Sequence, residues 1–208
     1  AYDSVPIDII ITVFMLLCSI DVAAYFLILT KKWREALQSD ELRFFLAVVF
    51  GATAVLTVAN LGVYTGFWES LRYTVFQVAS IISTTGFGTT DFVLWPQFSQ
   101  MIIVLLMFCG ACAGSTGGGM KCSRVLLLFR AIRRELHRIT HPRSVEVVKL
   151  DGKLVSEATL HTLLVFLGAY VATIFSAALI ISLDGFSFSV SFSAALTCVS
   201  NVGPGLEA

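Results

Sequence analysis

Ser83-Thr84-Thr85-Gly86-Phe87-Gly88-Thr89 follows a short apolar segment and lies between two long ones. Its two glycines can adopt positive φ angles, which residues with a Cβ resist. A Thr-x-Gly-aromatic-Gly run can therefore turn its backbone carbonyls toward one axis. In potassium channels such carbonyls replace the water shell of the ion. The stretch predicts a selectivity filter if the rest of the chain builds a membrane pore around it.

The composition is that of an integral membrane protein. Of 208 residues, 57% are hydrophobic and 13% are charged, and the mean hydropathy is +0.86. Soluble domains carry about 25% charged residues. The net charge is zero, which gives no indication of a nucleic-acid partner. The five cysteines are an odd number, which favours free thiols over a disulfide framework.

Four apolar segments have the length expected of membrane spans. One of them contains Asp21, and a carboxylate inside a span is expected to face the protein interior, a cavity or a partner. Asp21 is either an ion-path contact or a hydrogen-bonded packing residue. The four segments are Val5–Thr30, Phe44–Tyr64, the segment that starts at Phe98, and Thr159–Leu183.

Two further apolar segments, Leu71–Ser83 and Phe186–Val199, are too short to span a bilayer. Each fits a half-membrane helix that is followed by a return loop. Aligning Gly86 on Gly203 sets Thr84-Thr85-Gly86-Phe87-Gly88 over Asn201-Val202-Gly203-Pro204-Gly205. The alternative, two unrelated turns, does not explain why both preceding segments have half length. The repeated pattern therefore predicts two filter loops.

The span that starts at Phe98 is interrupted by a run of small residues from Gly110 to Gly119, which ends in Gly-Gly-Gly. Such a run cannot propagate a stable helix. It also lacks the GxxxxGK[ST] pattern of a phosphate-binding loop. We interpret it as a flexible break within a membrane helix, which can move and gate a path.

The distribution of positive charge predicts the orientation in the membrane. Of the fourteen Lys and Arg residues, all but Arg72 lie between Lys31 and Arg43 or between Lys121 and Lys153. The positive-inside rule places both regions in the cytosol and both loops toward the outer half. Apolar residues at helical spacing predict a cytosolic helix over Lys121–Arg138. Its charge either sets topology alone or docks an acidic lipid or soluble partner. The Asp-Gly pair in Val145–Val155 predicts a small β-hairpin.

Together these features resemble the membrane subunit of the Trk/Ktr/HKT potassium transporters, and bacterial Trk members most closely. The resemblance is carried by Ser83–Gly88, Gly110–Gly119, Asp40-Glu41-Leu42-Arg43 and Asn201–Gly205. It implies an all-α integral membrane fold with repeated span–pore helix–filter loop–span units, as in K+ channels. The family builds one pore from four such repeats, so the chain is expected to be a fragment. The implied domains are residues 1–34, the last helix of repeat two; 35–157, repeat three; and 158–208, repeat four up to its filter loop.

The resemblance also implies the function, which is K+ uptake across the bacterial plasma (inner) membrane by a multi-pass protein. No enzyme activity and no covalently bound cofactor are expected, and K+ itself is the bound ion. The backbone carbonyls of Thr84, Thr85, Asn201 and Val202 would hold K+ directly. The implied ion-binding residues are Thr84, Thr85, Gly86, Phe87, Gly88, Asn201, Val202 and Gly203. The implied gate residues are Gly110, Gly114, Ser115, Thr116, Gly117, Gly118, Gly119 and Lys121.

The implied partners are K+, the lipid bilayer, a second copy in a homodimer, and a cytosolic nucleotide-binding regulatory subunit of the TrkA or KtrA type. The stretch from Arg130 to Arg143 is the expected contact zone for that subunit, and no nucleic acid is expected. Three alternatives stay open. The first is a secondary transporter that couples K+ to Na+ or H+, or a Na+-permeable variant. The second is a coupled transporter of a larger solute. The third is an intramembrane enzyme, for which HExxH and GxSxG patterns are absent from the sequence.

Overall fold

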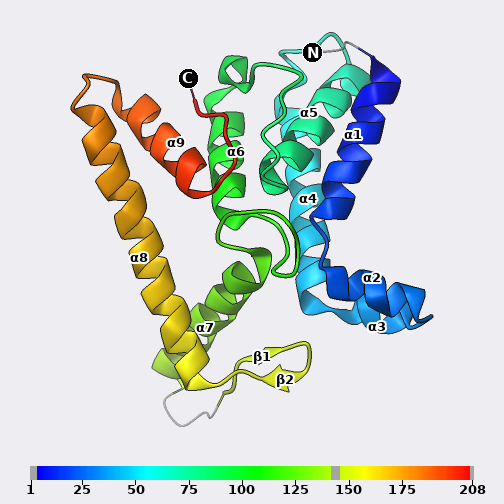
Figure 1. The fold of residues 1–208 in the computed structure, drawn as a ribbon, viewed down its shortest axis with the longest axis vertical. Helices are drawn as coiled ribbons and strands as arrows, with labels where there is room; N and C mark the ends of the chain where they lie inside the picture. The colour runs from blue at the N-terminus through cyan, green and yellow to red at the C-terminus, as the bar shows by residue number, and fades with distance from the viewer. Residues whose placement is uncertain (1–3, 142–145, 207–208) are drawn as a thin grey trace.

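The computed structural model describes residues 4–141 and 146–206, in which nearly all regular structure is helical (Figure 1). Arg143 and Val145, which belong to the expected contact zone and hairpin, lie outside these ranges. The elements are α1 (Val5–Cys18), α2 (Val22–Leu29), α3 (Trp33–Gln38), α4 (Asp40–Ala59), α5 (Phe67–Ile82), η1 (Phe92–Leu94), α6 (Gln97–Cys109), α7 (Cys122–Thr140), β1 (Lys149–Leu150), β2 (Lys153–Leu154), α8 (Glu157–Ser182) and α9 (Phe188–Val199).

Within the described residues, α4 and α8 are each long and apolar enough to cross a membrane. The pair α1 and α2 would make a third crossing if it were counted as one broken span. The helices α6 and α9 are apolar but shorter. In Figure 1, α5 and α9 descend on opposite sides of α6 from the end of the molecule where both termini lie. The two half-length segments therefore enter the bundle from the same side.

The expectation of one continuous helix over Val5–Thr30 is wrong. The helices α1 and α2 are bent by 93° at a short break. Asp21 is the N-cap of α2, and its side chain accepts a hydrogen bond from the Ala23 amide at 2.8 Å. The backbone around the break pairs with the glycine run instead: Cys112 N donates to Ser19 O, and Val22 N donates to Gly114 O. These contacts replace the helical bonds that the bend removes, and Asp21 matches the hydrogen-bonded alternative.

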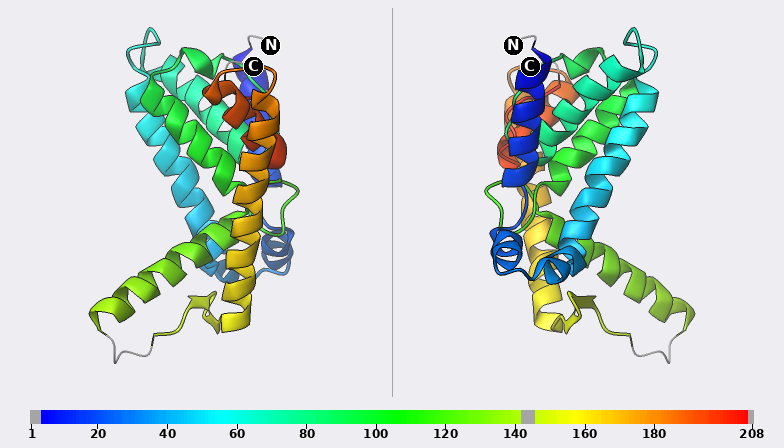
Figure 2. Two further views of the ribbon diagram at one scale, coloured as in Figure 1. Left: turned by 90° about the vertical axis from the view of Figure 1, so that its left-hand side faces the viewer. Right: turned by 90° about the vertical axis from the view of Figure 1, so that its right-hand side faces the viewer.

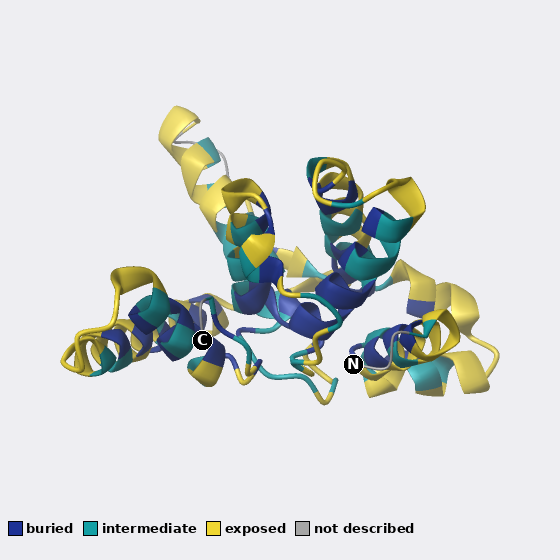
Figure 3. Cartoon of the chain, turned by 90° about the horizontal axis from the view of Figure 1, so that it is seen from above, coloured by how far each residue is buried: buried dark blue, intermediate teal, exposed yellow. Residues whose placement is uncertain are grey.

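The main core lies where α4, α5 and α6 meet, and residues of α8 and α9 complete it. Figure 3 shows buried residues at this centre and exposed ones on the outer helix faces. Phe45, Ile81 and Ile103 have no exposed surface. The outward surface is also apolar, since Leu179 and Leu183 of the α8 region are 70% and 81% exposed. Exposed apolar surface of this kind suits contact with lipid.

A partly buried ion pair joins α1 to α5. Arg72 Nε donates to Asp8 Oδ2 at 2.8 Å, and the two side chains are 22% and 6% exposed. Arg72 is the basic residue that lies outside both basic regions of the sequence. Its charge therefore has a structural partner within the bundle.

We expect Asp8→Ala to destabilise the full-length protein by about 1.5–3 kcal/mol, because the partly exposed Arg72 side chain loses the carboxylate that accepts its hydrogen bond. The measurement is the melting temperature of the detergent-solubilised protein. Glu35→Ala is the control, since the Glu35–Lys32 pair is more than half exposed and should contribute little. Equal melting temperatures for both variants would contradict a structural role for the Asp8–Arg72 pair.

The helix α7 and the hairpin that follows it form as the sequence predicts. The strands β1 and β2 pair in an antiparallel hairpin. The turn residues Asp151 and Gly152 have φ angles of 49° and 74°, as a type I′ turn requires. The helix α7 runs obliquely away from the bundle (Figure 2). It contacts the start of α8 through Arg134 and Glu157, and the Glu157 carboxylate holds the pKa of the Arg134 guanidinium above its ordinary value.

Candidate functional site

The first candidate loop leaves α5 through a short hydrogen-bonded bend. Thr84 N donates to Ile81 O at 3.1 Å, and Thr85 N donates to Ser80 O at 3.0 Å. Thr84 has a φ of 56° and Gly86 a φ of 76°. Two positive φ angles so close together turn the chain back sharply after the helix, as the glycine of this stretch allows.

The second candidate loop leaves α9 in the same way. Asn201 N donates to Cys198 O at 3.1 Å, and Val202 N donates to Thr197 O at 2.9 Å. Asn201 has a φ of 59° and Gly203 a φ of 109°. Each of these hydrogen bonds and positive φ angles lies 117 positions after the corresponding one in the first loop, as Gly203 does after Gly86. The two loops therefore share the backbone course of their first turn although their sequences differ.

The two loops approach each other closely at Gly86. A Cβ built on Gly86 would collide with the backbone oxygen of Val202 and would lie 3.1 Å from Pro204 Cδ. Only glycine fits here, both because of its φ and because of this contact. The C-terminal ends of α5 and α9 lead directly into the two loops, and a helix C-terminus carries a partial negative charge that favours a cation.

The glycine run between α6 and α7 lies against the starts of both loops. Gly118 N donates to Thr84 Oγ1 at 2.7 Å. A Cβ on Gly117 would lie 3.1 Å from Ser83 O, and one on Gly118 would lie 2.6 Å from Ser200 O. Glycine is therefore needed for the run to pack against the C-terminal ends of both half-length helices. We call residues 110–121 the glycine loop.

The glycine loop is held by side chains at its ends. Lys121, with a φ of 74°, donates through Nζ to Gly117 O and to Ser115 O. Glu41 of α4, which is 8% exposed, accepts hydrogen bonds from Ala113 N at 2.6 Å and Ser123 N at 3.1 Å. The Sγ atoms of Cys109 and Cys122, at the two ends of the loop, are 3.6 Å apart. The loop is thus an ordered segment with defined attachments.

The structure brings only part of the expected residue set together. Thr84, Gly86, Val202, Gly117 and Gly118 form one contiguous group. Asn201 also contacts this group, since a Cβ built on Gly118 would lie 2.8 Å from Asn201 Cβ. Four of the expected residues are less central. Phe87 is 55% exposed, and its carbonyl accepts a hydrogen bond from Ser80 Oγ at 2.5 Å. Thr116 and Gly114 contact the α1–α2 break instead: Thr116 Oγ1 donates to Cys18 O, and Gly114 packs on the Asp21 carboxylate. A Cβ built on Gly88 would have only Thr90 O nearby, at 3.8 Å.

Sequence reasoning missed two residues beside this group. It named Glu41 only within the motif Asp40-Glu41-Leu42-Arg43 and gave the residue no role of its own. It did not single out Gln77, which lines a cavity of about 360 Å³ with Gly88 and Pro204. Gln77 is fully buried on α5, and its amide finds no partner among the described residues. Its available signal was spacing, since the buried polar residues of α5 recur every three or four positions, at Ser70, Thr74, Gln77 and Ser80.

The side chains of the described residues contain no group of three or more His, Cys, Asp or Glu that could hold a metal ion. All five cysteines are free, as expected from their odd number.

Comparison with known proteins gives concordant matches. A family model described as "TrkH: Cation transport protein" matches residues 68–207. The Trk system potassium uptake protein TrkH of Escherichia coli K12 is 32% identical over 212 residues, which cover 99% of this chain and 43% of the relative. The Trk system potassium uptake protein TrkG of the same strain is 29% identical and covers all of this chain and 43% of the relative.

A solved structure also matches. The crystal structure of the potassium transporter TrkH from Vibrio parahaemolyticus aligns with a TM-score of 0.92 and 32% sequence identity. The alignment covers 99% of this chain and 45% of that chain. The present chain therefore spans less than half the length of the relatives it matches.

Proposed function

Because this chain belongs to the TrkH family of cation transport proteins, we propose that it forms part of a pore for potassium uptake. The sequence-level resemblance to bacterial Trk subunits is confirmed, and the matched relatives are transporters rather than enzymes. The chain is an integral membrane protein by family and by its span-length helices. Its place in the bacterial inner membrane is part of the proposal.

In the proposed pore, K+ binds to backbone carbonyls of the two loops. The observation that supports this most strongly is that two unlike loops share their hydrogen bonds and φ angles and meet at Gly86 and Val202. Carbonyls of Thr84, Thr85, Asn201 and Val202 would replace part of the water shell of the ion. The domain assignment follows: residues 35–157 supply one filter wall and residues 158–208 another, while residues 1–34 end a preceding repeat.

The glycine loop is the proposed gate. It contacts the ends of both half-length helices, so it would obstruct an ion that leaves the filter toward the cytosol. Its backbone lacks the regular bonds of a helix, and a segment of that kind can move at lower cost than a continuous helix can.

The partners remain proposals as well. A second copy and a cytosolic nucleotide-binding subunit would assemble with the full-length protein, with α7 and its arginines as one contact zone. The alternatives of Na+ or H+ coupling, or of Na+ permeation, gain no support from the described residues or from the names of the relatives.

The experiment that tests the function is Rb+ and K+ uptake by the full-length protein in cells that lack their own K+ uptake systems. We expect saturable uptake of both ions that excess Na+ does not abolish. Restored growth without K+ or Rb+ uptake, or uptake of Na+ alone, would overturn the proposal.

We expect Thr84→Val to raise K+ flux between about twofold and tenfold. The change keeps the branched shape of the side chain but removes the oxygen that accepts from Gly118 N, and a neutral hydrogen bond contributes about 0.5–1.5 kcal/mol. The measurement is flux in proteoliposomes. Thr173→Val is the matched control, because the Thr173 hydroxyl bonds only within α8. A Thr84→Val flux equal to that of the control would argue against contact between loop and filter.

A further inference from the structure

The first two residues of α4, Asp40 and Glu41, are adjacent carboxylates with different partners. Glu41 turns toward the glycine loop, where one oxygen, Oε1, accepts from both Ala113 N and Ser123 N. These two amides lie ten positions apart, near the two ends of the loop. A single buried carboxylate therefore holds both ends at once, and hydrogen bonds to a charged acceptor are the stronger kind.

Asp40 turns toward the cytosolic hairpin. Its amide donates to Asp151 Oδ1 at 2.6 Å, and its own Oδ2 accepts from Asp151 N at 3.0 Å. The same Oδ2 accepts from Arg130 of α7 at 2.8 Å, and Arg130 also donates to Lys149 O of β1. Asp151 thus caps the start of α4, which places a negative charge at a helix N-terminus.

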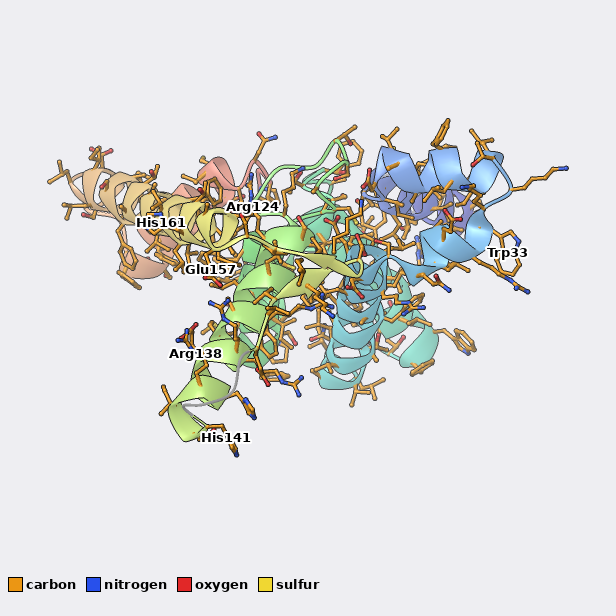
Figure 4. All side chains as sticks on the ribbon, turned by 90° about the horizontal axis from the view of Figure 1, so that it is seen from below. Trp33, Arg124, Arg138, His141, Glu157 and His161 are labelled. Atoms are coloured by element: carbon orange, nitrogen blue, oxygen red, sulfur yellow. The ribbon has the colours of Figure 1, made fainter. Side chains whose placement is uncertain are left out.

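These contacts form one continuous path. Seen from below, the hairpin lies between α7 and the start of α4 (Figure 4). The path runs from the hairpin tip through Asp40 to Glu41, and from Glu41 to the two ends of the glycine loop. Since Asp40 and Glu41 are consecutive residues at one helix end, a shift of the hairpin that displaces Asp40 must also displace Glu41.

We propose that Asp40 and Glu41 are positioning residues that couple the cytosolic hairpin to the glycine loop. Glu41 holds the loop against the filter, and the hairpin tip holds Glu41 in place by capping α4. A displacement of the hairpin from the cytosolic side would then move Glu41 and release the glycine loop. The inference deepens the proposed function and rests on it, because it assumes that the glycine loop limits K+ flux.

The prediction concerns basal K+ flux of the full-length protein in proteoliposomes. Glu41→Ala removes the acceptor and should raise flux on the order of tenfold, because two hydrogen bonds to a charged group are lost. Glu41→Gln keeps one oxygen and should give a smaller rise. Asp151→Gly removes the carboxylate that accepts from Asp40 N but keeps the backbone amide that donates to Asp40 Oδ2. Glycine tolerates the φ of 49° at this position. The flux of this variant should rise too, by less than that of Glu41→Ala. Glu35→Gln, on the exposed face of α3, is the control and should match the wild type.

The decisive readout is the double variant Glu41→Ala with Asp151→Gly. If both residues act on one path, its flux should not exceed that of Glu41→Ala alone, since contacts in one network are not additive. The K+ over Na+ selectivity should stay unchanged in every variant. A purely structural role would instead lower the melting temperature and the selectivity without raising flux.

The possible results separate the coupling from the gate. Wild-type flux in the Glu41 and Asp151 variants, with raised flux when Gly117–Gly119 is deleted, would overturn the coupling and leave the gate standing. Multiplying effects in the double variant, or an Asp151→Gly variant with wild-type flux, would also overturn the coupling. Wild-type flux in all of these proteins, the deletion included, would overturn the gate and the coupling together. If Glu41→Ala does not fold, the flux of Glu41→Gln is compared with that of Asp151→Gly and of the double variant Glu41→Gln with Asp151→Gly. Asp151 is exposed, so its replacement should not prevent folding.

Discussion

Replacing Gly86 with serine should reduce the preference of the full-length protein for K+ over Na+ at least about tenfold. A left-handed φ costs a residue with a Cβ about 1–2 kcal/mol, and Gly86 has a φ of 76°. A Cβ there would also collide with the Val202 oxygen, so the second loop must move as well. The measurement is the ratio of K+ to Na+ flux in proteoliposomes.

Gly203→Ser should have a smaller effect than Gly86→Ser. Gly203 has a φ of 109°, but a built Cβ meets no atom of the described residues within 4 Å. Strain alone acts there. Gly51→Ala is the control, because Gly51 lies within α4 with open space around it. Unchanged selectivity in both serine variants would remove the filter assignment.

Deleting Gly117–Gly119 should raise K+ flux on the order of tenfold or more, while K+ over Na+ selectivity is kept. Gly117 and Gly118 lie against the C-terminal ends of α5 and α9, and Gly119 lies against Gly110 and Met107. A loop without these three residues should lose its contacts with the helix ends. Each loss of about 1.4 kcal/mol of contact energy in the closed position changes the ratio of closed to open populations tenfold. The measurement is again flux in proteoliposomes.

A point substitution supports the same test with less disruption. Gly118→Ala would place a Cβ 2.6 Å from Ser200 O, which should displace the loop and raise flux to a lesser extent. Gly168→Ala on α8, where a Cβ meets nothing within 4 Å, is the control. If the Gly117–Gly119 deletion and Gly118→Ala both express and fold normally but show a flux equal to or below that of the wild type, the result would count against gating by the glycine loop.

Local sequence signals predicted most of the helical architecture. Apolar length identified α8 closely, and half length identified α5 and α9 as distinct from spans. The Asp-Gly pair predicted the hairpin turn, because its positive φ angles are a local property. The run from Gly110 to Gly119 predicted a break, since glycine density alone prevents a stable helix there.

Contacts between distant parts of the chain were beyond such signals. The bend at Ser19–Asp21 depends on backbone bonds to Cys112 and Gly114, and nothing in the apolar pattern of Val5–Thr30 reveals them. The attachment of Glu41 to Ala113 and Ser123 depends in the same way on where the loop folds. The resemblance to a family indicated which motif mattered, but only the fold shows what its acidic residues contact.

The most direct test of the central claim is the position of Tl+ or Rb+ in a crystal structure of the full-length protein, located by anomalous scattering. Backbone carbonyls of two unlike loops should bind the ion. We predict anomalous density between the loops, within coordination distance of carbonyl oxygens from Thr85 and Val202 and above the glycine loop. Density confined to carboxylate side chains elsewhere, with none between the two loops, would contradict a filter made from these residues.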